Sequence, residues 1–383
     1  MTIKFVDIGD PLMDGRLHGE RDMWHYGFGD KFSQIGTYLD DVTHDVEWTT
    51  SEGIVEIPLK TWYQVDKLIE WFNLLTAEQQ TLIKSNYLLF SYAMEPYTDN
   101  FYKEIEKFAD HLNKPYETVA VASSNSYSDL QSITKLKVLN MPSGWMQWFS
   151  RRWIERDQRQ HAAPKNLIWK PYVCLNARPR KQRCVMLGHL AQLGLIKKGH
   201  VSFGAGTGSI LGDVYNGPID AKNYIELCYK FKIPVFDSLT KQLPLEIDDQ
   251  QFQFDWSKFA GIEVLIEGVI NDNISRFECG SCYAHFSLTE KVWRPIYYGM
   301  PFVLRSSAES IEYAKSIGYH MYDDLCFNSG RSIAEFISDF CQWGKDSINN
   351  FRTGYRNHNK ELFLHQSTTD VDNLAQQVKE WIN

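Results

Sequence analysis

A cluster of four cations crowds the start of one predicted helix. Residues 167–175 read as a strand, and the helix that follows begins at Pro179, a residue favoured at the first helical position, and ends before Gly194. The four cations are Arg178, Arg180, Lys181 and Arg183. Because the amino end of a helix already carries about half a positive charge, each such cation costs up to about 1 kcal/mol. This arrangement favours an anion bound at the helix start.

A phosphate group is the anion that suits this segment. Arginine binds phosphate oxygens with two parallel hydrogen bonds, and the N–H groups of the first helical turn add further donors. Asn176, between the strand and the helix, belongs to the same candidate site. The alternative is an exposed amphipathic helix whose basic face meets acidic residues nearby.

A second predicted helix start also has residues that could bind an anionic ligand. Thr289 is a natural N-cap, Glu290 complements the helix dipole, and Gly299 ends the helix. Glu290 would accept hydrogen bonds from ribose hydroxyls, and Lys291 or Arg294 would bind a phosphate. The alternative is an ordinary capped helix without a ligand. Together the two helix starts predict a site for a nucleoside diphosphate.

A general base is expected in the first half of the chain. Glu95 follows the predicted strand 87–92, and the carboxyl ends of strands face the ligand in open α/β sheets. We therefore predict that Glu95 deprotonates an acceptor hydroxyl, with Asp10 as the second catalytic candidate. Further rivals near the first strand are Asp7, His18 and His25.

The chain is acidic overall, but one stretch is strongly basic. The net charge is −8, with 40 Lys and Arg against 48 Asp and Glu. Between Arg151 and Arg183, ten basic residues stand against two acidic ones, a local net charge of +8. Such asymmetry is typical of a segment that faces an anion, and a solvated basic surface is the alternative. The residues predicted to bind an acceptor or DNA phosphates are Arg151, Arg152, Lys165 and Lys170.

Other motifs lack the pattern of a known site. Residues 204–209 form a glycine-rich run without the spacing of a Walker A loop or of G-x-G-x-x-G, so we expect a flexible loop. Cys279, Cys282 and His285 resemble half of a zinc site, but the sequence offers no second pair of ligands. No Asp-x-Asp pair stands at the end of a predicted strand. We therefore predict no metal site and no required cofactor.

Strands and helices alternate along the chain. The predicted strands are 54–59, 87–92, 118–122, 136–139, 167–175, 200–203, 233–236, 261–270 and 301–304. The predicted helices are 65–75, 100–112, 179–193, 221–231, 289–298 and 310–317. This alternation predicts an α/β fold with mostly parallel sheets covered by helices. We expect an α/β domain over 1–160, a second over 161–350, and a helical segment over 351–383 that crosses back to the first domain.

Length and composition narrow the class of protein. With 383 residues, of which 43% are hydrophobic and 23% charged, the chain is neither disordered nor fibrous. Seven cysteines scattered over this length argue against a disulfide framework. No apolar run reaches the roughly 18 to 20 residues of a membrane span, and the first residues lack a secretory leader. We expect a cytoplasmic protein.

The segments around both helix starts resemble a group of phage-encoded glycosyltransferase-like proteins. These segments are residues 176–180, 288–295, 299–302 and 317–319. The Thr-Glu-Lys helix start at 289–291 is more distantly similar to the Ser-Glu-Lys segment of the α-1,3-fucosyltransferases. The resemblance covers residues 165–325 and leaves the first domain unassigned.

The resemblance implies the GT-B architecture, in which two Rossmann-like domains face each other across a cleft. The second domain would bind a nucleoside-diphosphate sugar without a metal, and Glu290 would bind its ribose. The residues implied to neutralise the diphosphate are Arg178, Lys181 or Arg183, and Lys291. The first domain would bind the acceptor and supply the base.

The expected reaction moves the sugar to a hydroxyl group. The acceptors we consider are a 5-hydroxymethylated pyrimidine in phage DNA, a glycan and a small alcohol, and a phage-encoded enzyme would act in the host cytoplasm. The alternative from another class is a non-catalytic nucleic-acid-binding or virion-associated phage protein whose basic stretch clamps phosphates. A dinucleotide-dependent oxidoreductase would need a glycine fingerprint that this chain lacks.

Overall fold

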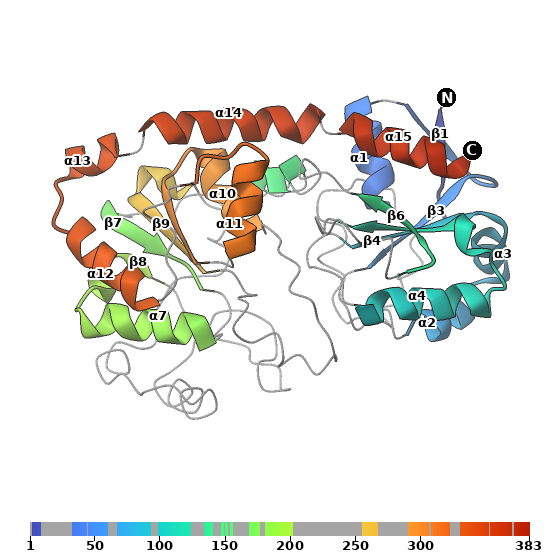
Figure 1. Cartoon of the computed structure of the whole chain (residues 1–383), viewed down its shortest axis with the longest axis horizontal. Helices are drawn as coiled ribbons and strands as arrows, with labels where there is room; N and C mark the ends of the chain where they lie inside the picture. Colours follow the sequence, from blue (N-terminus) through green and yellow to red (C-terminus); the bar gives the residue numbers. More distant parts are fainter. Residues whose placement is uncertain are drawn as a thin grey trace. The chain divides into compact units, whose positions relative to one another are not determined.

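Two parallel β-sheets organise the chain into two α/β units (Figure 1). Unit 1 consists of the described residues of 1–153, 271–290 and 364–383, and unit 2 of those of 154–270 and 291–363. The α/β class with two Rossmann-like units, expected from the sequence, is confirmed. The computed structural model describes residues 2–8, 33–43, 45–59, 67–92, 99–123, 134–140, 147–148, 150–151, 154–155, 168–176, 181–201, 255–266, 290–305, 308–321, 330–351, 353–369 and 371–383.

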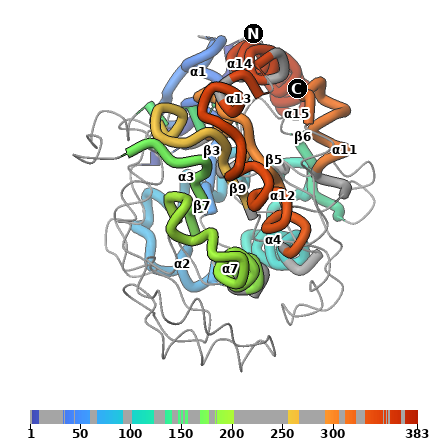
Figure 2. The backbone as a smooth tube through the Cα atoms, turned by 90° about the vertical axis from the view of Figure 1, so that its left-hand side faces the viewer, coloured from blue at the N-terminus to red at the C-terminus, as the bar shows by residue number. Residues whose placement is uncertain are grey.

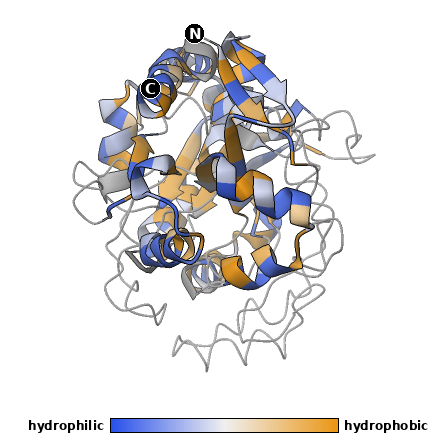
Figure 3. Cartoon of the chain, turned by 90° about the vertical axis from the view of Figure 1, so that its right-hand side faces the viewer, coloured by the Kyte–Doolittle hydropathy of each residue, from blue (hydrophilic) through white to orange (hydrophobic). Residues whose placement is uncertain are grey.

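Among the residues that the structure describes, the sheet of unit 1 has six parallel strands. In spatial order they are β2 (Val46–Thr49), β1 (Ile3–Val6), β3 (Ile54–Leu59), β4 (Tyr87–Tyr92), β5 (Val119–Ser123) and β6 (Lys137–Asn140). Parallel strands are covered on both faces, so they read as nearly continuous apolar runs. The central strands are largely orange, and so apolar, in Figure 3. All six residues of β3 are buried, and Glu56 is the only charged one among them.

Among the described residues of unit 1, five helices lie wholly within the unit and have described bounds. They are α1 (Gln34–Thr43), α2 (Leu68–Leu74), α3 (Ala77–Ser85), α4 (Asp99–His111) and α15 (Val371–Ile382). The buried stripe of α4 contains Phe101, Ile105 and Phe108, as its 3.6-residue period predicts. The ring of Phe108 meets Phe72 of α2 edge-on at 5.9 Å and Phe90 of β4 at 6.0 Å. These aromatic contacts hold α2 and α4 against one face of the sheet.

The last helix of the chain packs on unit 1. In Figure 1, α15 lies beside α1. The indole N–H of Trp381 donates a hydrogen bond to the carbonyl of Glu117 at 2.8 Å, and its ring meets Tyr87 edge-on. Gln377 accepts from the N–H of Asn140 at 2.9 Å and donates to its carbonyl at 3.1 Å, so α15 also binds the edge strand β6. The carboxyl-terminal residues therefore complete the first unit.

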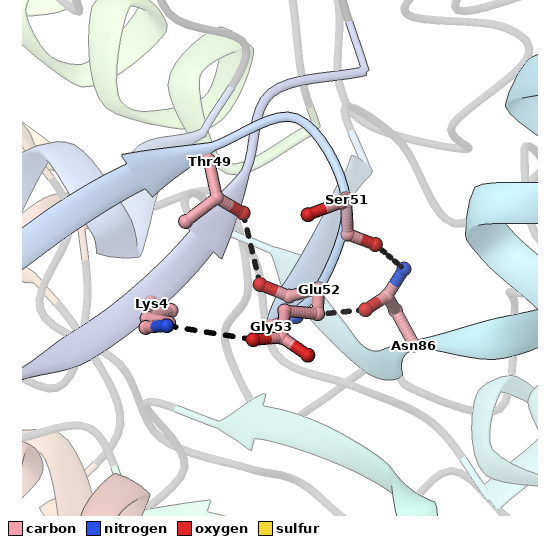
Figure 4. Close-up of polar contacts among 6 residues, drawn as sticks. All are labelled: Lys4, Thr49, Ser51, Glu52, Gly53 and Asn86. Carbon is pink, nitrogen blue, oxygen red and sulfur yellow. Dashed lines mark hydrogen bonds and ion pairs between the residues drawn. The ribbon is translucent and has the colours of Figure 1, made fainter.

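The turn between β2 and β3 requires a glycine (Figure 4). Gly53 has a φ of +148°, and a Cβ atom there would lie 2.5 Å from the carbonyl oxygen of Lys4. Its N–H donates to the side-chain oxygen of Asn86 at 2.7 Å, and the Asn86 amide donates to the carbonyl of Ser51 at 3.0 Å. These contacts hold the start of β3 beside β1 and thereby place the residues further along β3.

The described sheet of unit 2 has four parallel strands. In spatial order they are β10 (Phe302–Arg305), β9 (Ala260–Ile266), β7 (Lys170–Cys174) and β8 (His200–Val201). The described helices of this unit are α7 (Lys181–Gln192), α10 (Glu290–Tyr298), α11 (Ala308–Ser316), α12 (Gly330–Phe340), α13 (Lys345–Asn350) and the start of α14 (Thr353–Thr369). Helix α12 packs against α7, which Figure 2 shows nearly end-on. Gly194 and Gly299 follow α7 and α10 with φ of +68° and +61°, as predicted for helix-ending glycines.

Most predicted elements that fall on described residues are confirmed within a few residues. Strands β3 and β4 have the predicted bounds, whereas the strand list missed β1 and β2. The helix predicted at 65–75 begins at Leu68, and the separate helix α3 was missed although Thr76 and Gln79 form its capping box. The predictions at 204–236 lie outside the described residues. No helix in the described part of the chain is long and apolar enough to span a bilayer.

Candidate functional site

The strand order of unit 2 creates a switch point between β7 and β9. From β7 the chain passes through α7 to β8 on one side, and from β9 it continues to α10 and β10 on the other. Because β7 and β9 are neighbours, the connections leaving their carboxyl ends diverge. In open parallel sheets, ligands bind outside the carboxyl ends of the strands at such a point. Residues 174–176 and the first turn of α7 lie at this end of β7.

Asn176 is anchored just beyond the carboxyl end of β7. It is 2% exposed, and its side-chain amide donates a hydrogen bond to the Cys174 sulfur at 3.2 Å. Burial raises the pKa of the Cys174 thiol to about 11, although the Asn176 hydrogen bond and the Arg183 charge both lower it. The thiol is therefore protonated at neutral pH, and Cys174 holds Asn176 in place rather than acting as a nucleophile.

Arg183 brings a buried positive charge to the same point. It lies in the first turn of α7, which has no acidic residue there, and it is 4% exposed. Its charge lowers the pKa of the Cys174 thiol at the carboxyl end of β7, against the larger effect of burial. An anion bound here would be stabilised by the guanidinium, by the first N–H groups of α7 and by the helix dipole together.

The second predicted helix start lies on α10, which runs from Glu290 through Pro295 to Tyr298. On this helix, Arg294 forms a buried ion pair with Glu263 of β9. Burial lowers the pKa of Arg294 to about 10, so the guanidinium stays charged at neutral pH. The sequence predicted that Arg294 binds a phosphate. Its pairing favours a positioning role instead, in which Arg294 fastens α10 to the central sheet.

Unit 1 has a switch point of its own between β1 and β3. Helix α1 and strand β2 follow β1 on one side, and β4, β5 and β6 follow β3 on the other. Asp7 comes directly after β1, and its N–H donates to the carbonyl of Thr49 at 3.0 Å. Asp7 is thus the one predicted rival base that lies among the described residues. Glu56 of β3 is buried in the same region.

Many of the other predicted site residues lie outside the described residues: Glu95, Asp10, Arg178, Arg180, Thr289, Arg152 and Lys165. The backbones of Lys181, Glu290 and Lys291 are helical, and Arg151 is helical and half-buried. Lys170 stands at the amino end of β7, where its ammonium donates to the carbonyl of Gly199 at 2.9 Å and burial lowers its pKa. Lys170 therefore lies at the opposite end of β7 from Asn176.

Sequence reasoning missed two buried carboxylates. Glu56 and Glu263 each stand alone as the charged residue of an apolar strand, in β3 and β9 respectively. That pattern was a usable signal, because a charge in a buried strand must find partners inside the fold. Among the residues that the structure describes, no three His, Cys, Asp or Glu side chains gather as metal ligands. The Cys279, Cys282 and His285 motif lies outside that part of the chain.

No protein-family model and no curated protein matches the chain. Among solved structures, it is similar to trehalose-6-phosphate synthase from Burkholderia multivorans, with a TM-score of 0.46, 9% identity, and coverage of 86% of this chain and 72% of that one. The UDP-forming synthase from Burkholderia xenovorans, in complex with glucose-6-phosphate, gives 0.45 and 8%, with 99% of both chains covered. The amino-terminal domain of a Candida albicans trehalose-6-phosphate phosphatase gives 0.44 and 9%, covering 90% and 75%.

Proposed function

We propose that the protein is a GT-B-type glycosyltransferase that moves a sugar from a nucleoside-diphosphate sugar to a hydroxyl acceptor. Unit 2 would bind the donor and unit 1 the acceptor. Two Rossmann-like sheets, each with a switch point, suit this division, because such points bind nucleotides outside the carboxyl ends of the strands.

The observation that carries the proposal is the buried Arg183 in the first turn of α7, whose charge acts on the Cys174 thiol at the carboxyl end of β7. A core side chain at this position would ordinarily be apolar. A guanidinium at the start of a helix, together with the first N–H groups and the positive end of the helix dipole, forms a site that suits a phosphate group. We propose that the diphosphate of the donor binds there. Arg178, Lys181 and Lys291 are proposed to add to the same binding site.

In the proposed reaction, the acceptor oxygen forms a bond to the anomeric carbon of the sugar. The bond from that carbon to the diphosphate oxygen breaks, and the diphosphate leaves with the electron pair. Arg183 and the N–H groups of α7 stabilise this departing charge, so that the proposal requires no cofactor. The acceptor proton passes to a carboxylate of unit 1, for which Glu95 and Asp10 stay predictions and Asp7 is the described candidate.

We propose the acceptor only as a broad chemical class, a compound with a free hydroxyl group, whereas the donor is a nucleoside-diphosphate sugar. A 5-hydroxymethylated pyrimidine in phage DNA would depend on the basic residues Arg151, Arg152, Lys165 and Lys170 to hold the DNA phosphates. Lys170 binds the carbonyl of Gly199 instead and lies away from the switch point. The described residues therefore favour a glycan or a small hydroxyl compound over DNA.

A melting-temperature panel with UDP, GDP, CMP and their sugar conjugates tests the proposal. A ligand present at about 100 times its Kd stabilises the folded state by about 2.7 kcal/mol, so one nucleoside diphosphate should raise the melting temperature by several degrees. The absence of any shift, together with DNA binding that falls steeply with salt, would favour the non-catalytic nucleic-acid-binding alternative.

A further inference from the structure

Glu56 is a buried carboxyl group at the switch point of unit 1. It is 2% exposed and lies on β3 two residues beyond Ile54, the partner of Phe5 in β1. That places it level with the carboxyl end of β1, the end from which the connection to α1 leaves. In Rossmann-like units, this is the place where a helix start meets the phosphate of a ligand.

The residues at the amino terminus of α1 donate hydrogen bonds to this carboxyl group. The N–H of Ile35 donates to both Glu56 oxygens at 3.0 and 2.9 Å, and the N–H of Gly36 donates to Oε2 at 3.1 Å. The hydroxyl of Ser33 donates to Oε2, and that of Ser91 on β4 donates to Oε1. Glu56 thus occupies the N–H groups that a bound phosphate would use.

The neighbouring side chains leave little space for a second group. A Cβ atom on Gly36 would lie 2.5 Å from the Ser33 hydroxyl, 2.8 Å from the ring of Trp48 and 3.0 Å from that of Phe5. An incoming phosphate would have to displace the carboxyl group or lie against it. Both carry negative charge when ionised, so the second arrangement is repulsive.

We infer that Glu56 is a specificity-determining residue that fills the anion position of unit 1 from within, so that the acceptor group at this switch point is an uncharged hydroxyl compound and not a phosphate ester. The assignment of the acceptor to unit 1 rests on the proposed function. The finding that Glu56 occupies the amino terminus of α1 is independent of the proposed function.

Hydrogen–deuterium exchange read by mass spectrometry tests both statements on the full chain. The probes are inorganic phosphate, inorganic pyrophosphate and formate, each compared with sodium chloride at equal ionic strength. The peptides covering residues 33–43 report on α1, and those covering 181–192 report on α7. The variants are Glu56→Ala, which vacates the position, and Glu52→Ala, which removes an exposed glutamate near the turn of the same unit and serves as the matched control.

In the wild-type protein and in Glu52→Ala, phosphate and pyrophosphate should leave exchange at 33–43 unchanged. In Glu56→Ala the same segment should exchange faster, and formate should slow it again by about tenfold, since a small carboxylate can replace the missing one. Should Glu56→Ala fail to fold, the wild-type comparison of phosphate with sodium chloride at 33–43 still decides, since the inference requires that phosphate leave this segment unchanged.

Slowed exchange at 33–43 of the wild-type protein on adding phosphate would overturn the inference. If formate leaves the exchange rate at 33–43 of Glu56→Ala unchanged, the inference is overturned as well. Pyrophosphate that fails to protect 181–192 would count against the proposed donor site in unit 2 and leave the statement about Glu56 standing.

Discussion

The guanidinium of Arg294 on α10 and the carboxylate of Glu263 on β9 form an ion pair that is 3% and 2% exposed. It joins a largely buried helix of unit 2 to a central strand. Glu263 is also held through its backbone, because its N–H donates to the carbonyl of Pro301 at 3.0 Å. The pair therefore fixes the helix whose first turn carries Glu290 and Lys291, two of the predicted donor ligands.

Replacing Arg294 by Ala should strongly destabilise unit 2. Removing one partner leaves a buried charge without compensation, which costs about 3–5 kcal/mol. Urea denaturation followed by tryptophan fluorescence measures the loss, since Trp293 is buried on the same helix. The matched control is Arg331→Ala, because Arg331 forms an exposed ion pair with Glu335 whose loss costs less than about 1 kcal/mol.

Replacing both partners by apolar residues, Arg294→Met with Glu263→Leu, should recover most of the lost stability. An Arg294→Ala protein that keeps its stability but loses nucleotide binding would contradict the positioning role. It would return Arg294 to the set of phosphate ligands that the sequence predicts.

The stability of unit 1 should depend on the ionisation of Glu56. Burial raises its pKa above the ordinary 4.5, against the lowering effect of the Ser33, Ser91, Ile35 and Gly36 hydrogen bonds. The folded state then holds the proton more tightly than the unfolded state does. The stabilisation from Glu56 is complete below pH 4.5 and is lost as the pH rises through the raised pKa of the folded state.

Melting temperatures of the wild type and of Glu56→Gln across pH 4 to about 8 measure this dependence, because glutamine does not titrate there. The difference in stability, wild type minus variant, should fall with rising pH. A difference that grows with pH would mean that the four hydrogen bonds outweigh burial and lower the pKa of Glu56.

Cys174 should resist alkylation in the folded protein. With a pKa of about 11, its thiolate fraction at pH 8 is on the order of 0.001, and the sulfur is buried. Iodoacetamide labelling followed by peptide mass spectrometry should find Cys174 unmodified in the native protein and modified in 6 M guanidinium chloride. Labelling of native Cys174 at the rate seen in the denatured chain would show that the end of β7 is open to solvent.

The sequence predicted the frame of the fold better than the partners of its charged residues. Strands β3 and β4 are continuous apolar runs, and the glycines that end α7 and α10 are local signals, so each could be found from a short window. Strand β1 has only four residues, and its pairing with β2 and β3 is set by long-range contacts.

The partners of the charged residues in the candidate site also depend on long-range contacts, which a short window of sequence does not show. Arg294 at a helix start is compatible with a phosphate contact or with an internal ion pair, and only the fold shows that Glu263, 31 residues away, is its partner. Glu56 likewise meets a helix terminus 20 residues earlier in the chain. Arg183 was predicted from its place in a cluster of cations, but its burial beside Cys174 could not be, because that depends on how α7 packs on the sheet.

Calorimetric titration of a nucleoside diphosphate, chosen by its effect on the melting temperature, into the wild type, Arg183→Ala and Arg331→Ala tests the central claim most directly. Loss of the charge-assisted contact should weaken binding to Arg183→Ala by about 10- to 100-fold, while Arg331→Ala should bind as the wild type does. Circular dichroism verifies that each variant is folded. Equal affinity of a folded Arg183→Ala protein and the wild type would contradict the assignment of the donor diphosphate to the start of α7.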